Sequence, residues 1–227
     1  MSTLASALQS VRARIDRAAR AAGRGGSEIQ LLAVSKTWPA PRLREAWQAG
    51  QRAFGENYAQ EGVQKIGQLS DLTIEWHFIG PVQSNKTRAL AENFAWVHSV
   101  DREKIAERLS AARPPELPPL NVCLQVNVSG EATKGGVAPA DACALARAVA
   151  RLPHMRLRGL MTLPQPEHDQ EAQRKWFRML REIRDRVAAE GIALDTLSMG
   201  MSDDLEAAIL EGATIVRVGT AVFGPRR

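Results

Sequence analysis

The stretch "EIQLLAVSKTWP" (residues 28–39) starts like a buried β-strand and ends on polar residues. Five of the six residues at 29–34 are apolar, and Ser35, Lys36 and Thr37 follow directly. An open, doubly wound nucleotide-binding sheet would have a glycine-rich turn after its first strand, and this stretch has none. The pattern therefore favours another parallel α/β architecture, one whose first strand ends on a lysine.

Seven more apolar runs follow along the chain, with helix-length segments between them. The predicted strands span residues 29–35, 52–55, 75–80, 96–100, 121–128, 156–163, 196–200 and 215–219. The predicted helices span 41–49, 57–68, 84–93, 101–112, 139–150, 167–190 and 203–211. Strands that alternate with helices pair in parallel through right-handed crossovers. Eight such repeats predict an α/β fold, a closed (β/α)8 barrel of the TIM type.

An extra helix is predicted before the barrel, because Leu4, Leu8, Val11 and Ile15 have the spacing of a helix face that packs on a domain. An arginine-rich transit peptide is the alternative interpretation, and the structural helix is favoured. The Pro-rich piece "ARPPELPPL" fits a loop inside the repeat rather than a linker. We therefore expect one domain over residues 1–227.

Composition narrows the possible partners and location. The net charge of +5 raises nucleic acid as a partner, but the arginines are scattered among acids and only 5% of residues are aromatic, so we expect no nucleic-acid partner. No apolar run approaches the roughly 18–20 residues that span a bilayer, and the N-terminus lacks a signal-peptide core. Cys123 and Cys143 have no metal or redox spacing. Core thiols in a cytoplasmic protein are expected.

Lys36 is the strongest candidate for a chemically reactive side chain. A lysine at a strand end ordinarily reaches into solvent. At the mouth of an apolar barrel, desolvation would disfavour the ammonium form, and the free amine could form a Schiff base with a carbonyl. Lys86 and Lys134 lie in predicted loops and are secondary candidates. Weaker ones, in helical segments with charged neighbours, are Lys65, Lys104 and Lys175.

Two segments could bind a phosphate. In "SMGMSDDLEAA" (198–208) a strand, a glycine turn and a helix start follow one another, an arrangement whose backbone N–H groups can hold an oxyanion. Asp203 and Glu206 also resemble a capping box, which needs no ligand, and their charges would repel a phosphate on the helix itself. We therefore place a phosphate near Gly200 to Ser202 and near Gly219-Thr220, the usual position in this barrel.

Arg217 is flanked by Val216 and Val218. If the valines face the helices, the arginine points into the barrel, where a guanidinium needs an anion or another acceptor. An internal carboxylate and a ligand both remain open as its partner.

No metal site is expected, because none of the histidines has metal-ligand spacing. The four are His77, His98, His154 and His168. We expect His77 and His98 to form hydrogen bonds in the core or at the rim. Glu56 and Glu61 could be acid–base partners, with Glu61 facing solvent.

Several motifs strongly resemble those of the pyridoxal phosphate homeostasis family, the YggS/PROSC type. They are "AVSKTWP", "FGENYAQE", "WHFIGPVQSNKTR", "HSVDREKIAERL", "QVNVSGEATKGGV", "RGLMTLP" and "LSMGMSDDLEAAILEGATIVRVGTAVFG". The similarity runs from about residue 5 to residue 224, and the last motif is the most specific. The resemblance implies a fold-type III barrel like the N-terminal domain of alanine racemase.

The resemblance also implies a site for pyridoxal 5'-phosphate (PLP). It makes Lys36 the Schiff-base lysine and Arg217 the arginine that faces the pyridine nitrogen, which would weaken the cofactor as an electron sink. The implied phosphate loops comprise Ser198, Gly200, Met201, Ser202, Gly219 and Thr220. Asn57 and Ser35 are the implied neighbours of the ring.

The implied function is a PLP carrier, without catalytic residues or turnover. It would buffer the cofactor in vitamin B6 homeostasis and affect amino-acid and keto-acid balance indirectly, with PLP-dependent apoenzymes as further partners, and we expect a monomer. The alternative is a PLP-dependent amino-acid racemase, which on this fold needs a second base, typically a tyrosine from a partner's C-terminal β-domain. The chain ends at Arg227, soon after the eighth strand, and its only tyrosine is Tyr58, so the carrier is favoured. A sugar-phosphate barrel enzyme without PLP fits the motifs poorly.

Overall fold

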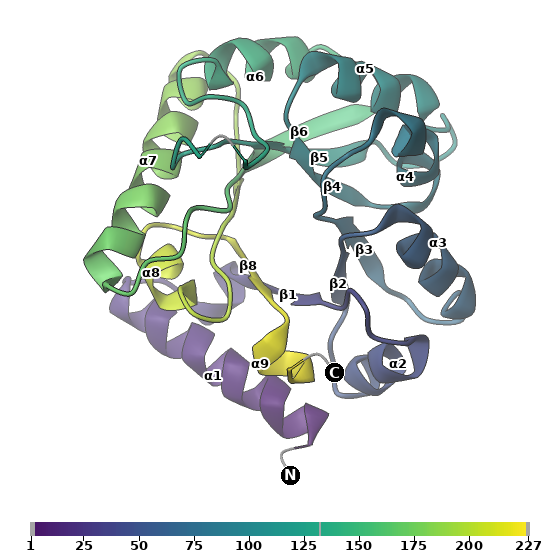
Figure 1. Cartoon of the computed structure of the whole chain (residues 1–227), viewed down its shortest axis with the longest axis vertical. Coiled ribbons are helices and arrows are strands. Elements are labelled where there is room, and N and C mark those ends of the chain that lie inside the picture. The colour runs from purple at the N-terminus through teal and green to yellow at the C-terminus, as the bar shows by residue number, and fades with distance from the viewer. Residues whose placement is uncertain (1–2, 132, 226–227) are drawn as a thin grey trace.

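The computed structural model describes residues 3–131 and 133–225, and its strands close into one parallel barrel in chain order. The strands are β1 (Gln30–Val34), β2 (Ala53–Glu56), β3 (Glu75–Phe78), β4 (Trp96–Val100), β5 (Leu120–Gln125), β6 (Met155–Met161), β7 (Thr196–Ser198) and β8 (Ile215–Val218). β1 pairs with both β2 and β8, which closes the ring. The predicted eight-stranded barrel is confirmed (Figure 1).

Helices follow the strands around the outside of the barrel (Figure 1). They are α1 (Leu4–Ala21), α2 (Ala40–Gln48), α3 (Ala59–Gln68), α4 (Thr87–Asn93), α5 (Glu103–Ala112), α6 (Ala142–Ala150), α7 (Gln170–Ala189), α8 (Leu205–Leu210) and α9 (Thr220–Phe223). Short 3-10 turns cover Gly26–Glu28 (η1) and Ser84–Lys86 (η2). The four residues of α9 were not predicted, because one turn of helix is too short to show a periodic pattern.

The N-terminal helix is part of the packed structure. Leu4, Leu8, Val11 and Ile15 of α1 are all buried, and α1 lies against α8 and α9 (Figure 1). The prediction of a structural helix is therefore confirmed. No helix in the described ranges is both long and apolar enough to cross a membrane.

The core has an outer and an inner layer because side chains alternate across each strand. In β8, Val216 and Val218 pack with helix residues in the large outer cluster. Ile215 instead packs inside the barrel with Leu32 and Ile79. This alternation points Arg217 into the barrel, as predicted.

The capping box predicted for Asp203 and Glu206 does not form. α8 begins at Leu205, one residue after Asp204. Glu206 pairs instead with Arg14 of α1 at 2.8 Å, so it joins two helices rather than capping one. The carboxylate of Asp204 accepts a hydrogen bond from the Met201 N–H, which stabilises the turn before the helix.

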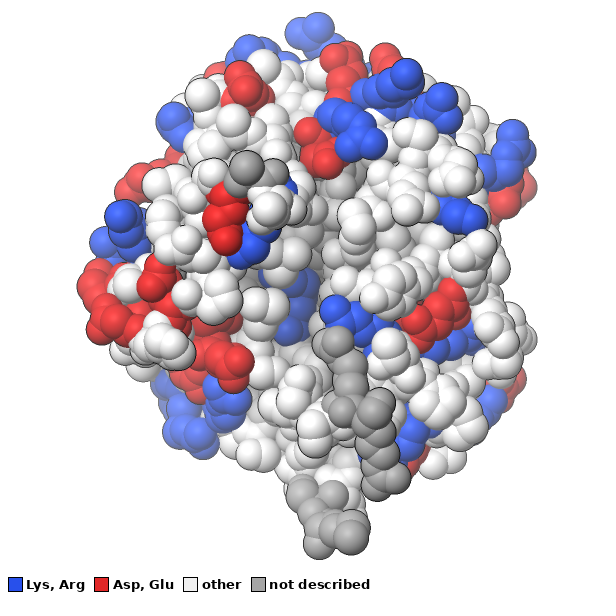
Figure 2. All heavy atoms as spheres, in the orientation of Figure 1, with Lys and Arg blue, Asp and Glu red and all other residues white. Residues whose placement is uncertain are grey.

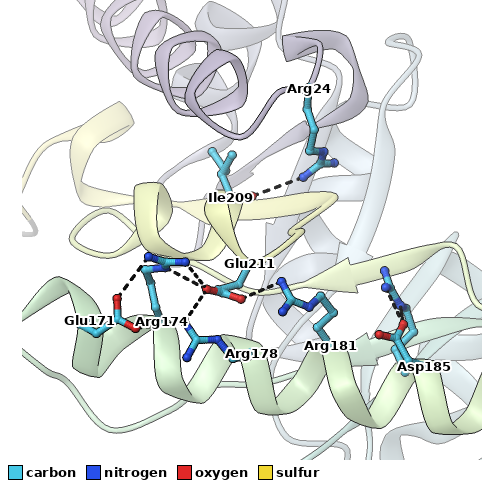
Figure 3. Close-up of polar contacts among 9 residues, drawn as sticks. Arg24, Glu171, Arg174, Arg178, Arg181, Asp185, Ile209 and Glu211 are labelled. Carbon is cyan, nitrogen blue, oxygen red and sulfur yellow. Dashed lines mark hydrogen bonds and ion pairs between the residues drawn. The ribbon is translucent and has the colours of Figure 1, made fainter.

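A buried carboxylate joins α8 to α7. Glu211 follows the last residue of α8, and its side chain is only 1% exposed. Three arginines on one face of α7 surround it: Arg174 and Arg178 lie 2.8 and 3.2 Å from Oε1, and Arg181 lies 2.8 Å from Oε2 (Figure 3). The cluster anchors the end of α8, and the start of α8 carries the loop that lines the pocket described below.

We expect Glu211→Gln to lower the free energy of unfolding by about 2 kcal/mol, because charge-assisted hydrogen bonds contribute about 1.5–3 kcal/mol and the arginines are partly screened by solvent. For a chain of this size, the melting temperature should fall by roughly 4–8 °C. Thermal unfolding checks this. Glu190→Gln, which removes an exposed pair with Arg147, is the matched control and should change stability by less than about 1 kcal/mol.

Candidate functional site

A pocket of about 250 Å3 opens where the strands end. Its walls come from the segments that follow β1, β2, β3, β6, β7 and β8. The lining residues are Val34, Lys36, Trp38, Asn57, Ile79, Leu163, Met201, Ser202, Asp203, Arg217, Gly219, Thr220 and Gly224. The molecule is hollowed near the middle of the face in Figure 2, and lysine or arginine atoms are visible there. Residues at the ends of six strands therefore meet at one rim of the barrel.

The backbone on both sides of Lys36 is held by charged side chains. Before it, the Ser35 carbonyl accepts a hydrogen bond from Lys65 Nζ at 2.8 Å. After it, the Thr37 N–H donates to Glu61 Oε1 at 2.6 Å. Thr37 has a φ of 68°, a left-handed conformation that is strained for a β-branched residue. These contacts stabilise the turn that directs Lys36 to the pocket.

Lys65 lies in a buried cluster beneath this turn. Its side chain is 5% exposed and pairs with Glu56 and Glu61 at 2.8 and 2.7 Å. The Ser35 hydroxyl donates to the same Glu56 oxygen at 2.6 Å. Burial raises the pKa of Glu56, and the nearby Lys65 partly offsets that rise. Glu61, which was expected to face solvent, is 26% exposed and bridges Lys65 and the Thr37 N–H.

Glycine is required at two turns around the pocket. Gly200 has a φ of 93°, and a Cβ there would lie 2.6 Å from the Ala208 Cβ, so the turn after β7 could not pack on α8 with a larger residue. A Cβ on Gly80, after β3, would lie 2.0 Å from the Asn57 carbonyl oxygen. These close approaches set the paths of the loops that carry Met201, Ser202 and Asn57.

Arg217 lies inside the barrel with neutral partners. Its Nη1 donates to Ser198 Oγ and its Nη2 donates to the Thr162 carbonyl, both at 2.8 Å. Burial lowers the pKa of Arg217 to about 10, so it remains charged near neutral pH. Among the described residues no carboxylate lies within 4 Å of it in an ion pair. Of the two partners that the sequence left open for Arg217, the described residues therefore supply no paired carboxylate, and its two protein acceptors are neutral.

Two histidines continue the polar interior beyond Ser198. His98 Nδ1 lies 2.8 Å from Ser198 Oγ, and His98 Nε2 lies 2.9 Å from His77 Nδ1. His77 Nε2 lies 2.7 Å from Oε1 of Glu75. Burial lowers the pKa of both imidazoles, and for His98 the charges of His77 and Arg217 lower it further. The expectation of hydrogen-bonded core histidines is confirmed.

Because of these two histidines, we expect the folded protein to become less stable as the pH falls. An unfolded histidine takes up a proton below pH about 6.5, whereas the folded imidazoles stay neutral to lower pH. The free energy of unfolding should therefore fall as the pH drops below about 6.5, by up to about 1.4 kcal/mol per pH unit for each histidine. Denaturant unfolding at several pH values checks this. His98→Gln should have a shallower slope than wild type, while the exposed His168→Gln should keep the wild-type slope.

Comparisons with known proteins agree on one family. The family model for the alanine racemase N-terminal domain matches residues 7–227. A protein from Pseudomonas aeruginosa named pyridoxal phosphate homeostasis protein is 62% identical, and the alignment covers 100% of this chain and 97% of the relative. A protein of the same name from Escherichia coli K12 is 53% identical, with 100% and 98% covered. The chain belongs to the pyridoxal phosphate homeostasis protein family.

A solved structure from the same group has a similar fold. PipY of Synechococcus elongatus PCC7942, with PLP bound, superposes with a TM-score of 0.85 at 37% identity, and the match covers 98% of this chain and 100% of PipY.

Seven of the ten residues that the homeostasis family resemblance predicted line the pocket: Lys36, Asn57, Met201, Ser202, Arg217, Gly219 and Thr220. The other three support the walls. Ser35 is turned toward Glu56, Ser198 contacts Arg217, and Gly200 forms the turn after β7. The two secondary lysines lie elsewhere: Lys86 lines a separate pocket with Tyr58, and Lys134 pairs with Glu131.

The apolar wall of the pocket was not predicted from the sequence. Trp38, Ile79 and Leu163 line it, and Trp38 stacks on Phe223 with ring centroids 5.9 Å apart. Each of the three lies in the last two residues of a predicted strand or just after one, so strand-end position could have identified them if apolar residues had been considered together with polar ones. Lys65 was also missed, because its burial depends on how α3 packs on the barrel.

Proposed function

We propose that this chain binds PLP in the pocket, with Lys36 as the residue that bonds to it, and holds the cofactor rather than turning over a substrate. One observation carries the proposal: Lys36 is the only lysine among the described residues that lines the pocket, and it shares that pocket with Arg217 and the turns at 200–202 and 219–220. The family's name and PLP-bound PipY support the same ligand.

The residues present fit a phosphorylated pyridine aldehyde. Trp38, Ile79 and Leu163 provide apolar contact for a ring. The buried Asn57 Oδ1 has no hydrogen-bond partner within residues 3–131 and 133–225, so it could accept a hydrogen bond from a ligand. Backbone and hydroxyl groups at Ser202 and Thr220 suit a phosphate. The carboxylate of Asp203 also lines the pocket, and we place the phosphate on the side away from it.

When bound, PLP would supply an aldehyde group that can react with a lysine amine. The chain's own groups position that amine: Lys65 and Glu61 hold the backbone on either side of Lys36. We assign Arg217, which lines the pocket, as the group that would donate to the ring nitrogen. Because a guanidinium does not give up its proton near neutral pH, that nitrogen would stay unprotonated, which limits withdrawal of electrons into the ring.

The ionisable groups of the pocket favour a carrier over a racemase. Racemisation removes and returns a proton on opposite faces of the substrate, which needs two bases. The ionisable lining residues within the described ranges are Lys36, Asp203 and Arg217. Tyr58 is 58% exposed and lines a different pocket. We infer a cytoplasmic, monomeric carrier whose recipients are PLP-dependent apoenzymes.

A titration with PLP, followed by an assay for turnover, tests the function. We expect uptake of one PLP per chain with a visible absorbance band, and no loss of optical activity when the loaded protein is incubated with L-amino acids. Clear racemisation would replace the carrier with the racemase. A protein that takes up no PLP would contradict both.

A further inference from the structure

A line of polar side chains runs through the barrel from its N-terminal end to the pocket. Glu75, at the start of β3, is 41% exposed at the far end. His77 and His98 are fully buried inside the barrel, and Ser198 is fully buried at the end of β7. Arg217 completes the line and lines the pocket. Each member lies within 2.9 Å of the next.

The two ends determine the direction of every hydrogen bond in this line. The contact with His77 lowers the pKa of Glu75 to about 2, so Glu75 is ionised and can only accept. The Arg217 guanidinium can only donate. A neutral imidazole and a hydroxyl each donate one proton and accept another. Only one arrangement of the protons therefore gives every group in the line both its donors and its acceptors.

In that arrangement each proton points toward Glu75. Arg217 donates to Ser198 Oγ, and the Ser198 hydroxyl donates to His98 Nδ1. His98 Nε2–H then donates to His77 Nδ1, and His77 Nε2–H donates to Glu75. Both imidazoles carry their proton on Nε2.

Within residues 3–131 and 133–225, no charged group outside the line lies at hydrogen-bond distance from its members. Gln30 also donates to Glu75 at 2.8 Å, and Trp96 stacks on His77 with centroids 5.3 Å apart. Burial raises the pKa of the Cys123 thiol to about 12, so that group is neutral. Asp204 attracts Arg217 electrostatically, but its carboxylate accepts from the Met201 N–H.

We propose that Glu75, His77, His98 and Ser198 are positioning residues that hold Arg217 in place without neutralising it. A carboxylate paired directly with Arg217 would neutralise the charge beside the pocket. Here the guanidinium is bound to two neutral acceptors, and the carboxylate that ends the line lies at the other end of the barrel. Arg217 therefore keeps its positive charge, and its remaining N–H groups are available to donate to an electron-rich acceptor on the ligand. This inference rests on the proposed function, with the PLP ring nitrogen as that acceptor.

The first test uses ligand-free protein. Side-chain nitrogen NMR of the wild type should show His77 and His98 neutral near pH 7, with the proton of each on Nε2. Glu75→Gln, at the exposed end of the line, should release His77 from a single tautomer, because an amide can both donate and accept. A proton on Nδ1 of either ring in the wild type, or a charged ring, would overturn the proposal.

The second test uses PLP as the probe. In His98→Gln the amide supplies one donor and one acceptor, so this variant should bind PLP with a dissociation constant within about twofold of wild type. His98→Met breaks the line and should raise the dissociation constant about fivefold, as expected for the loss of one net hydrogen bond. Equal affinity for the two variants would overturn the proposal. If the wild type takes up no PLP, the proposed function fails, and the ligand-free spectra still decide whether the line is ordered as proposed.

Discussion

Lys36→Ala protein is expected to show none of the visible absorbance that wild type gains when it is titrated with PLP. The expected loss is complete because, among the described residues, no other lysine lines the pocket. The phosphate and ring contacts would remain, so some binding should persist. We expect the apparent dissociation constant to rise by at least about tenfold, or about 1.4 kcal/mol. Absorbance titration and equilibrium dialysis measure the two effects separately.

Lys86→Ala is the matched control for that variant. Lys86 also follows a strand end but lines a different pocket, so its removal should leave the absorbance at the wild-type level. An absorbance band that survives in Lys36→Ala and disappears in Lys86→Ala would move the site to the neighbouring pocket.

Lys65→Met is expected to have the largest effect on stability. The substitution leaves Glu56, which is fully buried, without its positive partner, and it removes the hydrogen bond to the Ser35 carbonyl. Breaking a buried ion pair from one side costs about 3–5 kcal/mol. The melting temperature should therefore fall by roughly 6–20 °C. Because the same contacts hold the turn at Lys36, PLP uptake should also weaken.

Two further variants distinguish the loss of the Lys65 ion pair from the general effect of removing a lysine. Lys104→Met changes an exposed lysine of α5 and should alter stability by no more than about 0.5 kcal/mol. Lys65→Met combined with Glu56→Gln removes both charges and should be more stable than Lys65→Met alone. A double variant as unstable as the single one would show that packing, rather than the ion pair, sets the cost.

The barrel could be predicted because its signal repeats along the chain. Each strand is a short apolar run and most intervening helices are amphipathic, so errors at single boundaries do not change the topology. The predicted strands at 121–128 and 196–200 ran past the ends of β5 and β7, since buried residues continue beyond the last paired position. The capping box at Asp203 and Glu206 failed because a tertiary partner, Arg14, binds Glu206.

Lys36 and Arg217 could be predicted because strand position alone places them at the barrel mouth and in its interior. Lys65 could not, since its role depends on the rotation of α3 about its axis. One signal was available in the spacing: Gly62, Lys65 and Leu69 share a helix face, and the structure buries all three. The line from Glu75 to Arg217 joins β3, β4, β7 and β8, and no spacing within one segment reveals such a contact.

Borohydride reduction of PLP-loaded protein, followed by peptide mass mapping, shows directly whether Lys36 is the residue that bonds to PLP. Reduction makes the bond between PLP and a lysine permanent, so the modified residue can be identified by mass. We expect one phosphopyridoxyl group per chain, on the peptide that contains Lys36. A label on Lys86 or Lys134 with Lys36 unmodified would contradict it.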